Sequence, residues 1–167
     1  MRIIFWALIG ATIGIYGIMV LWSLPLITQE ADGLLPFDLR PFGYSYDEAT
    51  AFLNALSEEG RAFYLETQLL LDTAYPALLA ASLLWLIRLV FRGQMTRLAL
   101  SLIAIAASAA DYLENHAIEG LLSERASAAE ISTASLWTLA KSLGDTVVFT
   151  ALVLGVVMLA LRRWMPR

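Results

Sequence analysis

The sequence predicts an all-α protein, a bundle of four transmembrane helices, and three observations support this fold class. Hydrophobic residues make up 59% of the 167 residues, and the mean hydropathy is +0.70. A soluble domain of this composition would expose large apolar areas to water. Four apolar stretches are each long enough to cross, as a helix, a hydrocarbon core of roughly 30 Å. The chain is therefore expected to form a single integral membrane domain.

The four predicted spans differ in their connections. They cover residues 3–24, 63–91, 96–118 and 134–162, and a long first outer loop covers residues 25–61. The first span has a long apolar core with no A-x-A cleavage pattern after it, so we expect a retained anchor. The short connection RGQMTR predicts that the second and third spans are antiparallel neighbours.

Charge patterning predicts the orientation of the bundle. Seven arginines fall at one level if the helices alternate: Arg2, Arg88, Arg92, Arg97, Arg162, Arg163 and Arg167. The other level holds Arg40, Arg61, Arg125 and Lys141. Because cytoplasmic loops carry an excess of Lys and Arg, we expect both termini in the cytoplasm.

The first outer loop is patterned beyond what a linker needs. In GYSYDEATAFLNALSEEGR, Ser45 and Glu48 have capping-box spacing and Gly60 is placed to end a short amphipathic helix. This helix would lie on the membrane or cap the bundle. Upstream, LPFDLRPFGY predicts an ordered, non-helical strap that acts as a lid. The candidate lid residues are Asp38, Arg40, Tyr44 and Arg61. The alternative is an interfacial spacer in which Arg40 pairs with Asp38.

A second capping-box candidate lies in the other outer loop. Ser127 and Glu130 have the required spacing. The fourth helix is therefore expected to begin near Ala128 and to project above the bilayer.

Polar residues interrupt three of the four spans at one depth. Counted at 1.5 Å per residue from the inner ends, the carboxylates lie about 20–24 Å up, in the outer third of the membrane. Residues three and four apart share a helix face, and a charged group facing lipid is costly, so these faces should converge on one polar chamber roofed by the first outer loop. The candidate ligand-binding residues are Gln68, Asp72, Tyr75, Asp111, Glu114, Asn115, Lys141 and Asp145.

Several of these residues have simpler interpretations. Lys141 and Asp145 are one turn apart and would neutralise each other as an internal pair. Pro76 would kink its helix and free a backbone carbonyl near Asp72. We expect His116 to be solvated or packed rather than to act as a ligand.

Three stretches carry a resemblance to a known group of proteins. The sequence contains FDLRPFGYS, GRAFYLETQLLLDTAYP and DYLEN in this order, between Phe37 and Asn115. In these stretches the chain resembles a family of small, uncharacterised four-helix membrane proteins of bacteria, to which no activity is attached. A looser similarity in architecture links it to the EXPERA proteins, whose signature acidic residues do not align here. The resemblance implies that the lid and the chamber form one site, and that the protein lies in a bacterial cytoplasmic (inner) membrane.

Three functions compete at this point. The first is a chamber that binds a lipid or other amphiphile with a cationic or hydroxyl-rich head. The second is an intramembrane enzyme that uses the acidic cluster for acid–base chemistry or to bind a hard metal such as Mg, Mn or Ca. The third is an accessory subunit whose polar network fixes helix register. The sequence identifies no cofactor and no confident metal site. The expected partners are membrane lipids, and further a membrane protein or a second copy, but not nucleic acid.

Overall fold

The computed structural model describes residues 2–123 and 126–164, which form helices and connections without strands. Four helices are long and apolar enough to cross a membrane: Arg2–Gln29, Glu58–Val90, Gln94–Ser123 and Ala128–Arg162. The predicted all-α class with four spans is therefore confirmed. Arg125, Arg167 and the side chain of Arg163, which the charge pattern includes, lie outside the described part.

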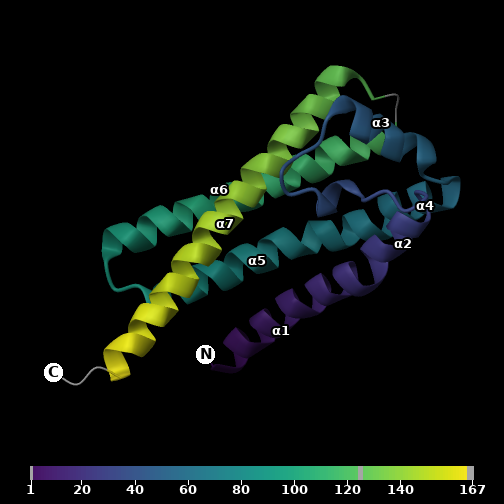
Figure 1. Ribbon diagram of the computed structural model, residues 1–167. Coiled ribbons are helices and arrows are strands. Elements are labelled where there is room, and N and C mark those ends of the chain that lie inside the picture. Colours follow the sequence, from purple (N-terminus) through teal and green to yellow (C-terminus); the bar gives the residue numbers. More distant parts are fainter. Residues whose placement is uncertain (1, 124–125, 165–167) are drawn as a thin grey trace.

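The bundle is built from antiparallel helices. Residues 91–93 join α5 (Leu69–Val90) to α6 (Gln94–Ser123), and α7 (Ala128–Trp164) completes the bundle. The start of α1 (Arg2–Ile18) and the end of α7 lie at the same end of the bundle as this turn (Figure 1). The cytoplasmic location of that end stays a prediction.

The first span continues further than its sequence predicts. After α1, a π-helical segment η1 (Met19–Ser23) leads directly into α2 (Leu24–Gln29). The sequence predicts the end of this span at Leu24, whereas the helix continues to Gln29. Pro25 lies in the first turn of α2, just after the π-helical segment, and its missing N–H removes one hydrogen bond from this continuous helix without ending it.

The second span begins earlier than predicted, at α4 (Glu58–Phe63), and passes through a second π-helical segment, η3 (Tyr64–Gln68), into α5. Ser57 caps α4 by accepting a hydrogen bond from the Gly60 N–H at 2.9 Å. Gly60 therefore does not end the preceding helix. A Cβ at Gly60 would lie 2.4 Å from the Cβ of Glu30, so glycine is needed here because α2 and α4 approach closely.

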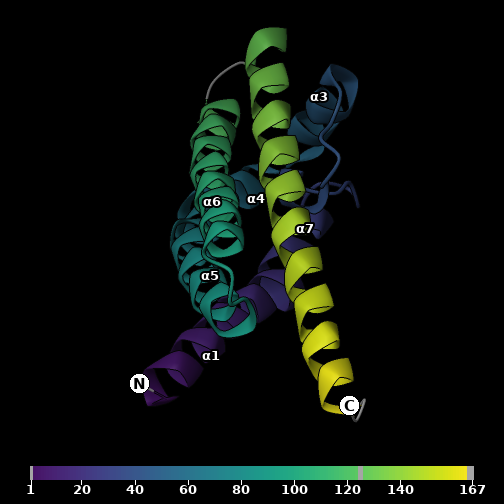
Figure 2. The same ribbon diagram turned by 90° about the vertical axis from the view of Figure 1, so that its left-hand side faces the viewer.

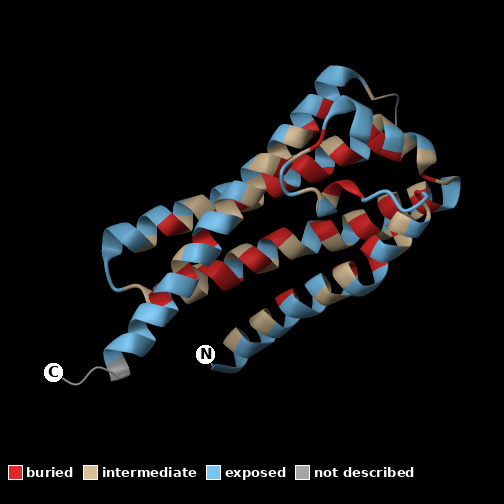
Figure 3. Cartoon of the chain, in the orientation of Figure 1, coloured by how far each residue is buried: buried red, intermediate tan, exposed pale blue. Residues whose placement is uncertain are grey.

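The helices pack in a definite order. α1 packs on α5, α5 on α6, and α6 on α7, while α7 also returns to contact α5. Figure 2 shows α6 and α7 running side by side. A Cβ at Gly144 would lie 2.8 Å from the Cβ of Ala107, so this glycine permits the close approach of α7 to α6. α1 is the edge helix, and Thr12 is its one buried residue (Figure 3).

The outer loop forms a cap over one end of the bundle. It contains a short 3-10 turn, η2 (Phe37–Leu39), and the helix α3 (Tyr46–Ala55). Ser45 and Glu48 form a complete capping box at the start of α3. The corresponding motif of Ser127 and Glu130 precedes α7, which begins at Ala128 as predicted.

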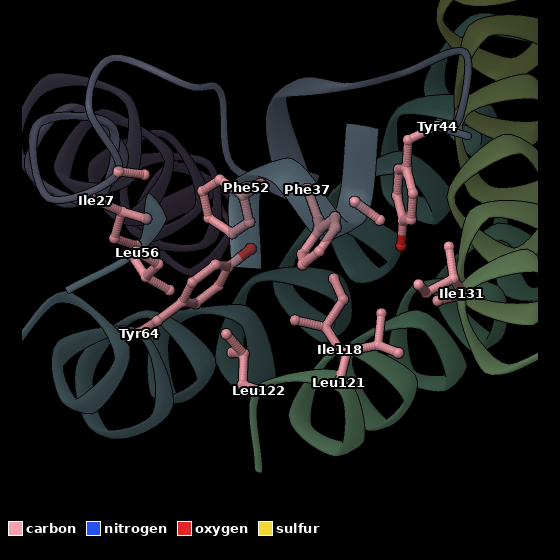
Figure 4. Packing of buried hydrophobic residues seen from close by; sticks show 13 residues of the cluster. Ile27, Phe37, Tyr44, Phe52, Leu56, Tyr64, Ile118, Leu121, Leu122 and Ile131 are labelled. Carbon is pink, nitrogen blue, oxygen red and sulfur yellow. The ribbon is translucent and has the colours of Figure 1, made fainter. Parts of the chain in front are cut away.

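Two hydrophobic clusters fill the two ends of the bundle. We call the outer one the cap cluster, which includes Ile27, Phe37, Tyr44, Phe52, Tyr64, Ile118 and Ile131. The inner cluster consists of Leu79, Leu83, Ile87, Leu100, Ala104, Val148 and Leu152. In the cap cluster the aromatic rings form a row (Figure 4). The ring centroid of Phe37 lies 4.7 Å from that of Tyr44 and 5.0 Å from that of Phe52. The polar residues lie between these two clusters.

Candidate functional site

A cavity of about 130 Å³ lies where α1, the cap and the three longer helices meet. We call it the chamber. Its polar lining consists of Tyr16, Asp38, Asp72, Tyr75, Asp111 and Lys141. The structure thus brings residues of all four spans and of the first outer loop around one space. Of the eight candidate ligand-binding residues, four line it: Asp72, Tyr75, Asp111 and Lys141.

Lys141 carries the positive charge of the chamber. Its Nζ lies 3.1 Å from Oδ1 of Asp111 and forms a second ion pair with Oε2 of Glu114. The other oxygen of Glu114 accepts a hydrogen bond from the hydroxyl of Thr138. The suggested pair between Lys141 and Asp145 on α7 itself is not formed, because two carboxylates of α6 face the ammonium group instead.

Asp72 is held by an amide and not by a cation. Nε2 of Gln68 donates to both carboxylate oxygens of Asp72 at 3.0 Å. The hydroxyl of Ser23 in turn donates to Oε1 of Gln68. Ser23 and Gln68 are the last residues of η1 and η3, so the two π-helical segments meet at this hydrogen bond. π-Helical turns are rare and often occur at functional sites.

Pro76 frees backbone carbonyls of α5, and α6 supplies their partners. Proline has no N–H to bond the carbonyl four residues earlier, and Nδ2 of Asn115 donates to that carbonyl, the one of Asp72, at 2.9 Å. The hydroxyl of Tyr112 donates to the Thr73 carbonyl, also at 2.9 Å. Asn115, a candidate ligand residue, therefore positions α5 against α6 with its amide nitrogen.

Tyr75 lines the chamber, and Asp145 lines a neighbouring crevice. The ring of Tyr75 stacks on the ring of Tyr16, with centroids 5.8 Å apart and planes 26° apart. Asp145 is half-buried and lines a narrow crevice together with Asp111 and Pro76. Among the described residues, Asp145 has no ion-pair partner.

Two of the four candidate lid residues are directed into the molecule. Asp38 lines the chamber and accepts a hydrogen bond from the hydroxyl of Tyr64. Tyr44 is buried in the cap cluster, and its backbone N–H donates to Oγ of Ser135 at 2.8 Å. Burial, followed by the nearby carboxylate of Glu114, raises the pKa of the Tyr44 phenol far above its usual range.

The other two lid candidates hold backbone carbonyls. Arg40 donates from Nε and Nη2 to the Leu35 carbonyl at 3.0 and 2.7 Å, so the suggested pair of Arg40 with Asp38 is not formed. Arg61 donates to the carbonyls of Leu53 and Leu122, and thereby ties α3 and the end of α6 to the start of the second span. Neither guanidinium group lines the chamber.

Metal ligation finds no geometric support in the part of the chain that the structure describes. No three His, Cys, Asp or Glu side chains there are grouped so that they could hold a metal ion. The ammonium group of Lys141 lies between the carboxylates of Asp111 and Glu114, in the place that a metal ion would occupy. His116 is exposed, with Nδ1 3.6 Å from Oε2 of Glu119, in agreement with a solvated histidine.

Sequence reasoning missed Ser23, Tyr64 and Thr138. Tyr64 lies four residues before Gln68, and Thr138 lies three residues before Lys141, so helical spacing alone places both on faces that already carry candidates. Ser23 gave no comparable signal, since it lies one residue before the predicted end of the first span.

No protein-family model, curated protein or solved structure matches the chain. The resemblance to a bacterial four-helix family and the looser one to EXPERA proteins therefore stay predictions. A functional interpretation has to be based on the chamber itself.

Proposed function

We propose that the chamber binds the polar head of a lipid or other amphiphile of the outer leaflet, and that this head is cationic or rich in hydroxyl groups. Four apolar helices compatible with membrane spans surround the chamber. Tyr75 lies fifteen residues from the inner end of α5 at Val90, which is about 22 Å along the helix. The chamber is thus within reach of a molecule dissolved in the outer leaflet, in a core of roughly 30 Å.

The charge balance of the chamber is the observation that carries the proposal. Lys141 pairs with both Asp111 and Glu114. Two further carboxyl groups line the chamber, those of Asp38 and Asp72, and a third, that of Asp145, lines the neighbouring crevice next to Asp111. Within the described ranges, no lysine, arginine or histidine forms an ion pair with any of these three. Unpaired carboxylates at membrane depth are costly, so a cationic head, or hydroxyl groups that donate hydrogen bonds, would stabilise the occupied chamber.

The rest of the lining suits an amphiphile. The stacked rings of Tyr16 and Tyr75 offer aromatic surface next to the carboxylates, and aromatic faces attract cations. Apolar side chains complete the wall, among them Met19 and Leu39. Tyr16 is 52% exposed, so the aromatic edge of the chamber is open to the surrounding lipid.

Native mass spectrometry of the protein extracted in mild detergent, with elemental analysis of the same sample, tests this proposal. We compare the wild type with Asp72→Asn, which removes a chamber carboxylate, and with Asp47→Asn, which makes the same change on the exposed face of α3. A bound amphiphile in the wild type and in Asp47→Asn, but not in Asp72→Asn, is expected.

Other outcomes of this experiment select other functions. A stoichiometric metal lost in Asp72→Asn would favour the metal-assisted enzyme. A stoichiometric partner protein with no small molecule would favour the accessory subunit. A wild-type chain that is empty after extraction in several mild detergents contradicts amphiphile binding.

We further propose that the protein resides in a bacterial cytoplasmic (inner) membrane with both termini inside. The support is the excess of arginine at the end of the bundle where α1 starts and α7 ends, including Arg2, Arg88 and Arg162. A reporter that is active only in the cytoplasm, fused to the C-terminus, should be active. A periplasmic reporter that is active at the same position would reverse the orientation.

A further inference from the structure

The segment between α2 and α3 exposes more apolar surface than a loop in water should. We call residues 33–43 the strap. Four of its large apolar side chains are exposed: Leu34 at 36%, Leu35 at 48%, Leu39 at 36% and Phe42 at 91%. They line a surface groove of about 530 Å³ together with Arg40 and Glu48. Contiguous exposed apolar patches mark contact with a membrane, a ligand or another protein.

The strap lies deep along the bundle. Asp38 and Leu39 line the same chamber as Tyr75 and Asp111, which belong to the middle parts of α5 and α6. Tyr75 is about 22 Å above the inner end of α5, and the hydrocarbon core is roughly 30 Å thick. Figure 1 shows the dark blue strap running beside the outer half of the bundle before the chain reaches α3. With Val90 at the inner boundary of such a core, the chamber and the strap residues that line it, Asp38 and Leu39, lie within the core.

More than half of the backbone N–H groups of the strap are hydrogen-bonded within the protein. Pro36 and Pro41 have no N–H group, which leaves nine residues of the eleven that do. Five of these nine donate to carbonyls of α2, of the turn that follows it, or of the strap itself, namely Gly33, Leu34, Leu39, Arg40 and Gly43. The guanidinium group of Arg40 donates two hydrogen bonds to the Leu35 carbonyl. In lipid, backbone groups have to be satisfied within the protein, and five of the nine N–H groups and the Leu35 carbonyl of the strap meet this condition.

We propose that the strap is a re-entrant segment whose exposed side chains contact the acyl chains of the outer leaflet. Its position at the depth of the spans and its internal hydrogen bonds favour lipid over water or a second protein as the medium at this surface. Leu39 lines both the surface groove and the chamber. The strap is therefore a wall between the chamber and the bilayer. This inference does not depend on whether the chamber binds an amphiphile.

Site-directed spin labelling tests the proposal, because the chain contains no cysteine and single-cysteine variants need no background changes. Nitroxide labels are attached to Phe42→Cys and Leu35→Cys in bilayer nanodiscs of phosphatidylcholine. Leu102→Cys, an exposed position within the third span, is the control for lipid. Asn54→Cys, an exposed position on α3, is the control for water. Accessibility to oxygen and to a nickel chelate is measured for each label.

Both strap labels are expected to behave like Leu102→Cys, with higher accessibility to oxygen than to the nickel chelate. Labels that are as accessible to the chelate as Asn54→Cys would place the strap in water and overturn the proposal. Labels shielded from both reagents would show that protein covers the strap, which also overturns it. Phe42→Trp, with fluorescence quenching by brominated lipids, checks the result without an attached label. Because Phe42 is 91% exposed, neither Phe42→Cys nor Phe42→Trp removes core packing.

Discussion

The outer and inner halves of the bundle are built on different interactions. The inner cluster is aliphatic, and its helices are regular α-helices. The outer half contains the aromatic cap cluster, both π-helical segments, and a buried network of carboxylates around Lys141. The same four helices pass through both halves, but the cap, which supplies Phe37, Tyr44 and Phe52, packs on the outer half alone.

This difference shows how each half fixes its geometry. The inner half depends on close packing, as at Gly155, where a Cβ would lie 2.4 Å from Cγ1 of Val90. In a bilayer such packing, and not a hydrophobic driving force, holds helices together. The outer half depends on directional contacts, such as that of Gln68 with Asp72. Polar networks specify one arrangement of groups when they are fully satisfied.

The largest effect is expected for Lys141→Met. The substitution leaves Asp111 and Glu114 without their cation, and Glu114 is fully buried. Removing one partner of a buried ion pair costs about 3–5 kcal/mol of folding free energy. The measurement is the free energy of unfolding in mixed detergent micelles titrated with SDS.

The matched control is Arg88→Met, at an exposed position in the last turn of α5. It should change stability by less than about 0.5 kcal/mol. In a Glu114→Gln background, Lys141→Met should cost less, because one carboxylate fewer is left uncompensated. Equal costs for Lys141→Met and Arg88→Met would contradict the central role of Lys141 in the outer half.

Truncations of large side chains in the two halves should differ next. Phe52 in the cap cluster and Leu83 in the inner cluster are both buried. Phe52→Ala should cost about 3–5 kcal/mol, since the cap meets water and both the transfer and the cavity contribute. Leu83→Ala should cost about 1–2 kcal/mol, because lipid is as apolar as leucine and only packing is lost. The same SDS titration measures both, and equal losses would mean that the cap lies within the bilayer.

A third test concerns the junction between the halves at Pro76. Asn115→Ala removes the donor to the freed Asp72 carbonyl, at an expected cost of about 1 kcal/mol. In a Pro76→Ala background the restored N–H can bond that carbonyl within α5, so the cost of Asn115→Ala should be smaller. If the cost is unchanged in that background, the amide does not act through the carbonyl.

Helical periodicity accounts for the part of the chamber that could be predicted from sequence. Asp111 and Glu114 are three apart on α6, and Gln68 and Asp72 are four apart on the second span, so each pair shares a face. The cost of exposing charge to lipid turns these faces inward. Residue spacing within one helix therefore indicated which side chains would gather.

Contacts between helices and departures from regular geometry could not be predicted in this way. Lys141 had Asp145 as its neighbour on α7, and only the rotation and tilt of α7 against α6 bring it to Asp111. No sequence pattern predicts that η1 and η3 are π-helical. The depth of Asp38 depends on the path of the strap, which its prolines restrict but do not determine.

The smallest effect is expected at the capping box of α3, far from the chamber. Ser45→Ala should cost about 0.5–1 kcal/mol, because the exposed helix loses its cap. The Ser45 N–H, followed by its hydroxyl, holds the pKa of Glu48 below its ordinary value. This contribution to stability is complete above the pKa of Glu48 in the unfolded chain and is lost as the pH falls through the lower folded value. Ser45→Ala keeps the backbone N–H and loses only the hydroxyl, which also accepts from the Glu48 N–H. Thermal unfolding in detergent should therefore show the difference between Ser45→Ala and wild type becoming smaller in acid without vanishing. A difference that is constant with pH would mean that the Ser45 hydroxyl stabilises α3 without any contribution from the charge of Glu48.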